Sequence, residues 1–233
     1  MNLALVFPGQ GSQNTSMLDG FSNIDAFKNI IQNASDILGY DVASVVKDET
    51  KLNNTIYTQP IMLAVSYAIS EIFKEECNPE IQIAAGHSLG EYSALVCNST
   101  IDFKDGLLLV KKRAELMAEA MNHVDGGMAA VIGLDAKVVN EICIESSKDN
   151  EIIEAVNFNC PGQTVIAGHS EAIDKITPIL KNKGAKIVKK LPVSIAAHTS
   201  LLKSTADELK NELQKIIFKE NTFDIVHNYD LSI

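Results

Sequence analysis

The stretch Ile81–Cys97, IQIAAGHSLGEYSALVC, contains the turn around which the rest of the chain is organised. A strand-like apolar segment leads into Gly86-His87-Ser88-Leu89-Gly90, and a segment able to form a helix follows. G-x-S-x-G between a strand and a helix is typical of a nucleophile elbow, which exposes a serine hydroxyl at the end of a strand. Glycines on both sides lack the Cβ atoms that would block close packing of strand against helix. The alternative is an ordinary strand-to-helix turn.

The composition is that of a globular protein able to bury a core, because 46% of the 233 residues are hydrophobic and 21% are charged. No apolar run approaches the roughly 18 residues that a membrane helix needs. The N-terminus lacks the basic leader of a signal peptide. We therefore expect a cytoplasmic protein with no membrane association.

The cysteines and histidines are not spaced for a metal. The four cysteines include no C-x-x-C pair, and the five histidines include no H-E-x-x-H pattern. Reduced thiols and no metal are the expectation. A net charge of −10 argues against binding of nucleic acid, because the phosphate backbone is bound by a basic surface.

Apolar periodicity predicts strands and helices along the whole chain. A capping residue followed by proline, Thr58-Gln59-Pro60, predicts a helix start. The predicted strands are 3–7, 81–85, 128–134, 152–158, 164–167, 185–191 and one beginning at 223. The other predicted helices are 24–38, one after the elbow, 103–121, 137–147, 170–181 and one from after 198 to about 218.

The order of these elements predicts two domains of an α/β protein. From 128 to 191 the order is β-α-β-β-α-β, which is the ferredoxin-like signature. Outside this range strands alternate with helices, as in a parallel sheet. We therefore expect an insert at 126–191 within a discontinuous core of 1–125 and 192–233. A cleft between two such domains is a common place for a ligand.

A serine nucleophile needs a base, and His198 is the candidate. It lies in a loop of small residues, Ala196-Ala197-His198-Thr199-Ser200, between the insert and the next helix. His87 adjoins the serine but points to the other face, and the remaining histidines lie near element ends, where solvent exposure is expected. The alternative for His198 is a structural histidine at a helix start.

The only arginine in the chain, Arg113, falls within the apolar arc of the predicted helix 103–121. A buried guanidinium requires a partner, because an unpaired buried charge is costly. Its planar fork suits a carboxylate. That carboxylate could belong to a substrate, or to an Asp or Glu of the protein in an internal salt bridge.

Six motifs, which occur together and in order along the chain, resemble those of the acyltransferase family of fatty acid synthesis, the malonyl-CoA:acyl carrier protein transacylases. The resemblance covers essentially the whole chain. The motifs are Phe7–Gln13 (FPGQGSQ), Thr58-Gln59-Pro60, Gly86–Tyr92 (GHSLGEY), Arg113, Asn157–Gln163 (NFNCPGQ) and Pro192 to His198. The resemblance implies an α/β-hydrolase-like core with a ferredoxin-like insert.

The resemblance also implies roles for individual residues. Ser88 would be the nucleophile and His198 its general base. The backbone amides of Gln10 and Leu89 would form the oxyanion hole, and Arg113 would hold the malonyl carboxylate. The residues expected to line the pocket are Gln59, Asn157 and Gln163.

The implied substrates are malonyl-CoA and acyl carrier protein, and no cofactor is required. The family expectation is a monomer. Acyl carrier protein is acidic in this family, so an acidic chain needs a local basic patch to bind it. The candidates, with a solvated lysine face as the alternative, are Lys181, Lys183, Lys186, Lys189 and Lys190.

One departure from the family concerns the C-terminus. In the family the chain continues, and a later segment supplies a carbonyl that orients the histidine, whereas this sequence ends at Ile233. Three hypotheses follow: a malonyl transferase, a serine thioesterase or hydrolase on the same scaffold, and a low-activity form that binds acyl carrier protein. The loop before His198 does not predict which acyl group is preferred.

Overall fold

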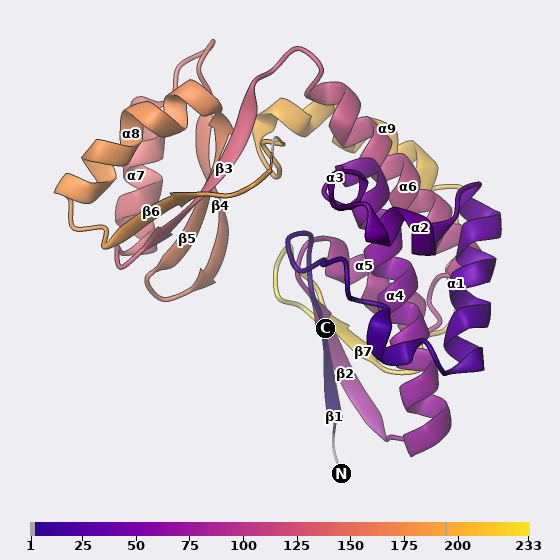
Figure 1. The fold of residues 1–233 in the computed structure, drawn as a ribbon. Helices are drawn as coiled ribbons and strands as arrows, with labels where there is room; N and C mark the ends of the chain where they lie inside the picture. The colour runs from indigo at the N-terminus through magenta and orange to yellow at the C-terminus, as the bar shows by residue number, and fades with distance from the viewer. Residues whose placement is uncertain (1–2, 194) are drawn as a thin grey trace. The chain divides into compact units, whose positions relative to one another are not determined.

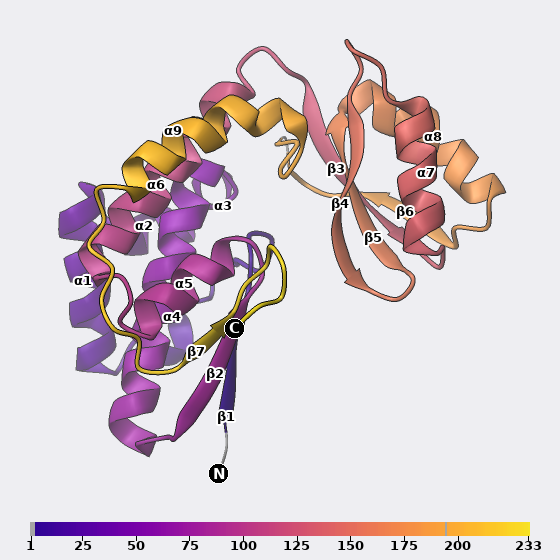
Figure 2. The ribbon, with the colours of Figure 1, turned by 180° about the vertical axis from the view of Figure 1, so that it is seen from behind.

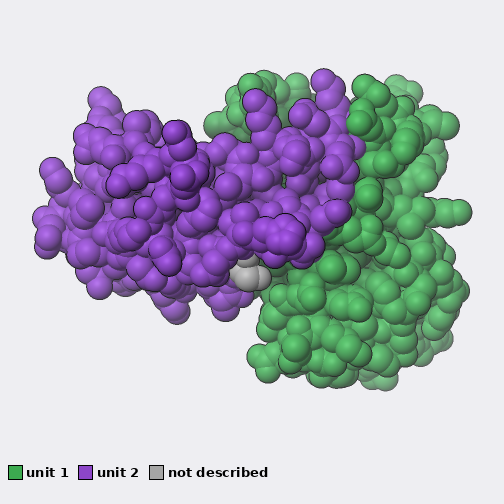
Figure 3. Space-filling view, turned by 90° about the horizontal axis from the view of Figure 1, so that it is seen from above, with its two compact units in different colours: residues 1–115, 211–233 green, residues 116–210 purple. Residues whose placement is uncertain are grey.

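The computed structural model describes residues 3–193 and 195–233, and it falls into two compact units (Figure 3). Unit 1 comprises Met1–Glu115 with Asn211–Ile233, and unit 2 comprises Leu116–Lys210. The chain passes into unit 2 within helix α6 (Phe103–Ala120) and returns within helix α9 (Lys203–Leu213). The insert expected at 126–191 lies within unit 2, which extends beyond it at both ends.

Unit 1 is built on three parallel strands in the order β1 (Leu3–Phe7), β2 (Ile81–Gly86) and β7 (Asp224–Val226). Helix α5 (Leu89–Cys97) packs against β2 and β1 (Figure 1). Apolar side chains meet between strands and helix because alternate strand residues point to the same face. The buried members of this cluster are Phe7, Ala84, Ala94, Cys97, Phe223 and Ile225. The expected α/β class with a parallel sheet is confirmed.

Among the described residues, a short 3-10 helix (Asp19–Phe21) and four α-helices precede the elbow: α1 (Asp25–Leu38), α2 (Val42–Lys47), α3 (Glu49–Leu52) and α4 (Thr55–Cys77). The predicted start of α4 at Thr58 is wrong, because the Asn54 side chain accepts from the Ile56 N–H (3.1 Å) and begins the helix earlier. The Thr58 hydroxyl instead donates to the carbonyls of Leu52 and Asn54. The buried residues of this helix lie between Thr55 and Ser70.

Helix α9 is shorter than predicted, since it ends at Leu213 rather than near residue 218. In the segment that follows, Ile217 and Phe218 are 74% and 54% exposed. Beyond them, the Lys219 N–H donates to the Thr100 carbonyl and its Nζ pairs with Asp102 at 2.5 Å. These contacts hold the chain against the loop between α5 and α6 as it approaches β7.

Unit 2 contains an antiparallel sheet in the order β4-β5-β3-β6. Helices α7 (Ala136–Ser146) and α8 (Ser170–Asn182) cover one face of it, as Figures 1 and 2 show. The apolar core lies between the helices and the sheet. The strands are β3 (Gly126–Ile132), β4 (Ile153–Cys160), β5 (Gln163–His169) and β6 (Ile187–Lys190).

Within the described ranges, no helix is long and apolar enough to cross a membrane. The same residues contain no group of three His, Cys, Asp or Glu that could hold a metal ion. All four cysteines are free thiols, as expected. Burial raises the pKa of Cys97 and of Cys143 to about 12.

Candidate active site

The elbow is a sharp turn between β2 and α5 that places Ser88 in a rare backbone conformation. Ser88 has φ 53° and ψ −104°, a region that residues with a side chain seldom adopt. A Cβ on Gly86 would lie 1.9 Å from the Gly90 carbonyl carbon, and one on Gly90 would lie 2.2 Å from the Phe7 carbonyl oxygen. Only glycine fits at either position, so this turn requires the G-x-S-x-G spacing of the sequence.

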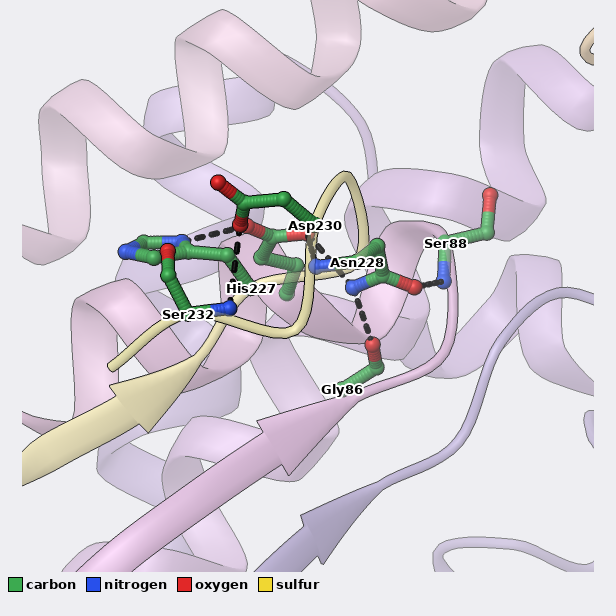
Figure 4. Close-up of polar contacts among 7 residues, drawn as sticks. Gly86, Ser88, His227, Asn228, Asp230 and Ser232 are labelled. Carbon is green, nitrogen blue, oxygen red and sulfur yellow. Dashed lines mark hydrogen bonds and ion pairs between the residues drawn. The ribbon is translucent and has the colours of Figure 1, made fainter.

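Ser88 directly precedes the first turn of α5, whose unpaired amides carry a partial positive charge. Its side chain does not cap that helix. Figure 4 shows the Ser88 hydroxyl pointing away from the residue's own N–H. The backbone amide of Leu89, the first residue of α5, belongs to this first turn.

A chain of hydrogen bonds links the first loop to the buried interior of α4. The Thr55 hydroxyl donates to Gln10 Oε1 (2.9 Å), and Gln59 Nε2 donates to the Thr55 hydroxyl (2.8 Å). Gln59 is fully buried, with 0% of its surface exposed. The side-chain oxygen of Gln59, Oε1, accepts from Arg113 Nη1. The loop residue Gln10 and the helix residue Gln59 are thus fixed in one network.

Arg113 is 9% exposed and lies beside Ser88. Its Nη2 is 3.3 Å from Ser88 Oγ, its Nη1 donates to Gln59 Oε1, and its Cζ is 5.4 Å from the centre of the Tyr92 ring. No carboxylate of residues 3–193 or 195–233 forms an ion pair with it, so the internal salt bridge considered above is not found. Burial lowers the pKa of Arg113, and Tyr92 opposes that shift.

A guanidinium stays protonated at neutral pH even when its pKa falls. The site therefore holds a desolvated cation whose partners are an amide oxygen, a hydroxyl and an aromatic ring, all formally neutral. Such a cation lacks the anion that would offset its loss of water. The described part of unit 1 thus offers a binding position for an anionic group next to the Ser88 hydroxyl.

The other three residues expected at the site belong to unit 2. His198 is exposed and has φ 65°, in a turn closed by the Thr199 hydroxyl donating to the Ala196 carbonyl (2.8 Å). Asn157 follows a register shift in β4, and Gln163 begins β5 and accepts from the Cys160 thiol (3.6 Å). Their roles remain predictions.

Comparison with known proteins agrees with this geometry. The model of the acyl transferase domain family matches residues 4–230. The chain belongs to the acyl transferase family. The malonyl CoA-acyl carrier protein transacylase of Salmonella typhimurium is 42% identical over 231 residues, which are 98% of this chain and 74% of that protein.

Two solved acyl transferases have the same fold. The structure of the malonyl CoA-acyl carrier protein transacylase from Coxiella burnetii matches with a TM-score of 0.93 and 38% identity, over 98% of this chain and 73% of that one. A malonyl-transacylase in complex with its type II PKS acyl-carrier protein matches with a TM-score of 0.95 and 42% identity. That match covers 100% of this chain and 76% of the other.

Two residues for which no role was predicted, Asn228 and His227, also lie at the elbow. Asn228, which lies two residues after β7, bonds to the backbone of Gly86 and Ser88 and to the side chain of Glu91. His227 was expected to be solvent-exposed, but its ring Nδ1 is 2.9 Å from Glu91 Oε1 and its side chain is 42% exposed. Glu91 stands within the GHSLGEY motif, whereas Asn228 carried no local signal.

Proposed function

We propose that the protein transfers a malonyl group from coenzyme A to the phosphopantetheine thiol of acyl carrier protein, for fatty acid synthesis. The observation that carries this proposal is Arg113, a buried cation 3.3 Å from the hydroxyl of an elbow serine, with which no carboxylate of the described residues forms an ion pair. An acyl group that bears a carboxylate supplies the missing anion. A neutral acyl group leaves the cation uncompensated.

The reaction we propose has two halves joined by an ester on Ser88. His198 takes the proton of the Ser88 hydroxyl as Oγ attacks the thioester carbon. The tetrahedral oxyanion accepts hydrogen bonds from the amides of Gln10 and Leu89. The carbon–sulfur bond then breaks, and coenzyme A leaves with the proton from His198. The phosphopantetheine thiol repeats these steps in reverse and restores Ser88.

Arg113 and Gln59 hold the acyl group during this sequence. The free carboxylate of a malonyl ester is separated from the ester carbonyl by one methylene, which is short enough to stay beside a guanidinium at hydrogen-bond distance from Oγ. A fork of two N–H donors fixes the carboxylate in direction as well as distance. Gln59, held by Thr55, fixes the guanidinium in turn.

Unit 2 would contribute the base and part of the pocket wall. We propose a ferredoxin-like subdomain here, and the strand order β4-β5-β3-β6 with two helices on one face supports it. It would be inserted at 126–191 into an α/β-hydrolase-like core of 1–125 and 192–233. The pocket-wall residues would be Asn157 and Gln163.

We further propose that the enzyme works as a cytoplasmic monomer without a cofactor. Coenzyme A and phosphopantetheine enter the reaction as substrates. The lysines of unit 2 are the candidates for binding an acidic carrier protein, because two of them, Lys189 and Lys190, lie on β6 and are exposed.

The proposal is tested by mixing the protein with malonyl-CoA and recording the intact mass. We expect a covalent adduct of one malonyl group that disappears in Ser88→Ala and is discharged by holo acyl carrier protein. Absence of the adduct in the unaltered chain would contradict the proposal.

A further inference from the structure

The side chain of Asn228 bridges the nucleophile elbow from one peptide to the next. Its Nδ2 donates to the Gly86 carbonyl (2.6 Å), and its Oδ1 accepts from the Ser88 N–H (3.2 Å). These two groups flank His87, so a single planar amide holds the backbone on both sides of that residue. Figure 4 shows the amide between the end of β2 and Ser88.

Glu91 holds this amide in place. Its carboxylate accepts from Asn228 Nδ2 (2.5 Å) and from the Asn228 backbone N–H (3.2 Å). The other oxygen of the carboxylate contacts His227 Nδ1 at 2.9 Å. The loop itself is closed by the His227 N–H donating to the Ser232 carbonyl (2.9 Å). Asn228 therefore has little freedom to turn away from the elbow.

The held peptide is the one that sets the direction of the Ser88 side chain. Because Ser88 has φ 53°, its backbone is in a region that persists only where the surroundings enforce it. A bond to the Ser88 N–H fixes the plane of the His87–Ser88 peptide, and Oγ and the following Leu89 amide are directed from that plane by φ and ψ of Ser88. The Asn228 bonds act on the N–H side of Ser88, while its hydroxyl points the other way (Figure 4).

We propose that Asn228 is a positioning residue for acyl transfer, which it supports by holding the backbone of the nucleophile in its strained conformation. The inference rests on the proposed role of Ser88 as nucleophile. Asparagine suits this position because its side-chain amide carries both the donor that the Gly86 carbonyl needs and the acceptor that the Ser88 N–H needs. Aspartate has the same shape but no donor when ionised, and alanine has neither group.

The test compares Asn228→Asp and Asn228→Ala with a matched control, Asn98→Ala. Asn98 is a buried asparagine at the other end of α5, and its Nδ2 donates to the Phe223 carbonyl (3.1 Å), which also ties the chain near β7 to that helix. We measure kcat and KM for malonyl-CoA, thermal unfolding, and hydrogen exchange of a peptide spanning 86–92.

We expect both Asn228 variants to lose about 10- to 100-fold in kcat, with KM changed less than about twofold, because a misdirected nucleophile reacts slowly but leaves binding intact. Exchange in 86–92 should accelerate. Asn98→Ala should lower the unfolding temperature and leave kcat unchanged. Asn228→Asp keeps the shape, so it decides the matter if Asn228→Ala does not fold.

Three other results have distinct meanings. If the unaltered chain is acylated and Asn228→Asp has its normal kcat, the inference is overturned while the proposed function stands. If the unaltered chain is not acylated by malonyl-CoA, the proposed function is overturned and the inference falls with it. A loss of kcat in Asn98→Ala equal to that in the Asn228 variants would also overturn the inference, because the effect would then be general loosening of the fold.

Discussion

The two units differ in what they bury. Among the described residues, unit 1 buries a guanidinium and two amide side chains, Arg113, Gln59 and Asn98, whereas the buried polar side chains of unit 2 are threonines, Thr164, Thr199 and Thr205. Burial of a large polar group is costly unless it is hydrogen-bonded, and burial of a charge costs more. In unit 1 Arg113, bonded to Gln59, bears this cost beside Ser88, which indicates that these two groups serve a ligand, whereas Asn98 ties the chain near β7 to the far end of α5.

The largest expected effect is that of removing the nucleophile in unit 1. Ser88→Ala should lower malonyl transfer at least about 10³-fold, because no other group forms the ester. Steady-state transfer to acyl carrier protein measures it. Retention of transfer would mean that the polar burial around Ser88 serves another purpose.

The second effect separates a malonyl transferase from a hydrolase of neutral acyl groups. Arg113→Ala should lower kcat/KM for malonyl-CoA about 100-fold, the size expected for loss of a charge-assisted pair of hydrogen bonds. The matched substrate is acetyl-CoA, which lacks the carboxylate and should react no more slowly than before. Unchanged turnover of malonyl-CoA in Arg113→Ala would favour the hydrolase hypothesis.

A smaller effect is expected at the residue that holds the guanidinium. Gln59→Leu keeps the side-chain size but removes the acceptor for Arg113, so KM for malonyl-CoA should rise about 10-fold. Thr58→Val is the control, since Thr58 is equally buried on α4 but bonds to carbonyls rather than to Arg113. It should lower stability alone. Equal KM values in both variants would show that the contact with Gln59 is not functional.

The smallest effect is expected in unit 2. Thr164 is fully buried, and its hydroxyl has no hydrogen-bond partner among the described residues. Thr164→Val should therefore stabilise the fold by about 1 kcal/mol, because it removes an unsatisfied polar group, and it should leave transfer unchanged. Thermal unfolding measures this change. A loss of transfer activity would contradict the view that the buried polar groups of unit 2, unlike those beside Ser88, do not serve the reaction.

Local patterns predicted much of unit 1 and the order of elements in unit 2. The elbow was predictable because two glycines around Ser88 leave few other ways to pass from strand to helix. The position of Arg113 was predictable because helical periodicity places a residue on a face regardless of its partners. The start of α4 was not predictable from Thr58 and Pro60, because a proline can also lie within the first turns of a helix whose capping side chain, here that of Asn54, comes earlier.

Contacts between distant segments could not be predicted from a single sequence. Asn228 and Ser88 are brought together by the pairing of β7 with β2, and no local sequence pattern around either residue predicts this contact. The partners of Arg113 within unit 1 were not predictable either, because helical periodicity gives the face on which a residue lies but not the side chains that it contacts. That Arg113 bonds to Gln59 rather than to an Asp or Glu depends on which side chains the fold brings to it.

The most direct test of the account is a crystal structure of the protein carrying the malonyl ester on Ser88. We expect the malonyl carboxylate to lie within about 3 Å of both terminal nitrogens of Arg113, in the geometry of a bidentate pair. A carboxylate directed into solvent or bound to a lysine, with Arg113 bonded to Gln59 but to no part of the malonyl group, would contradict the claim that this buried cation selects the acyl group.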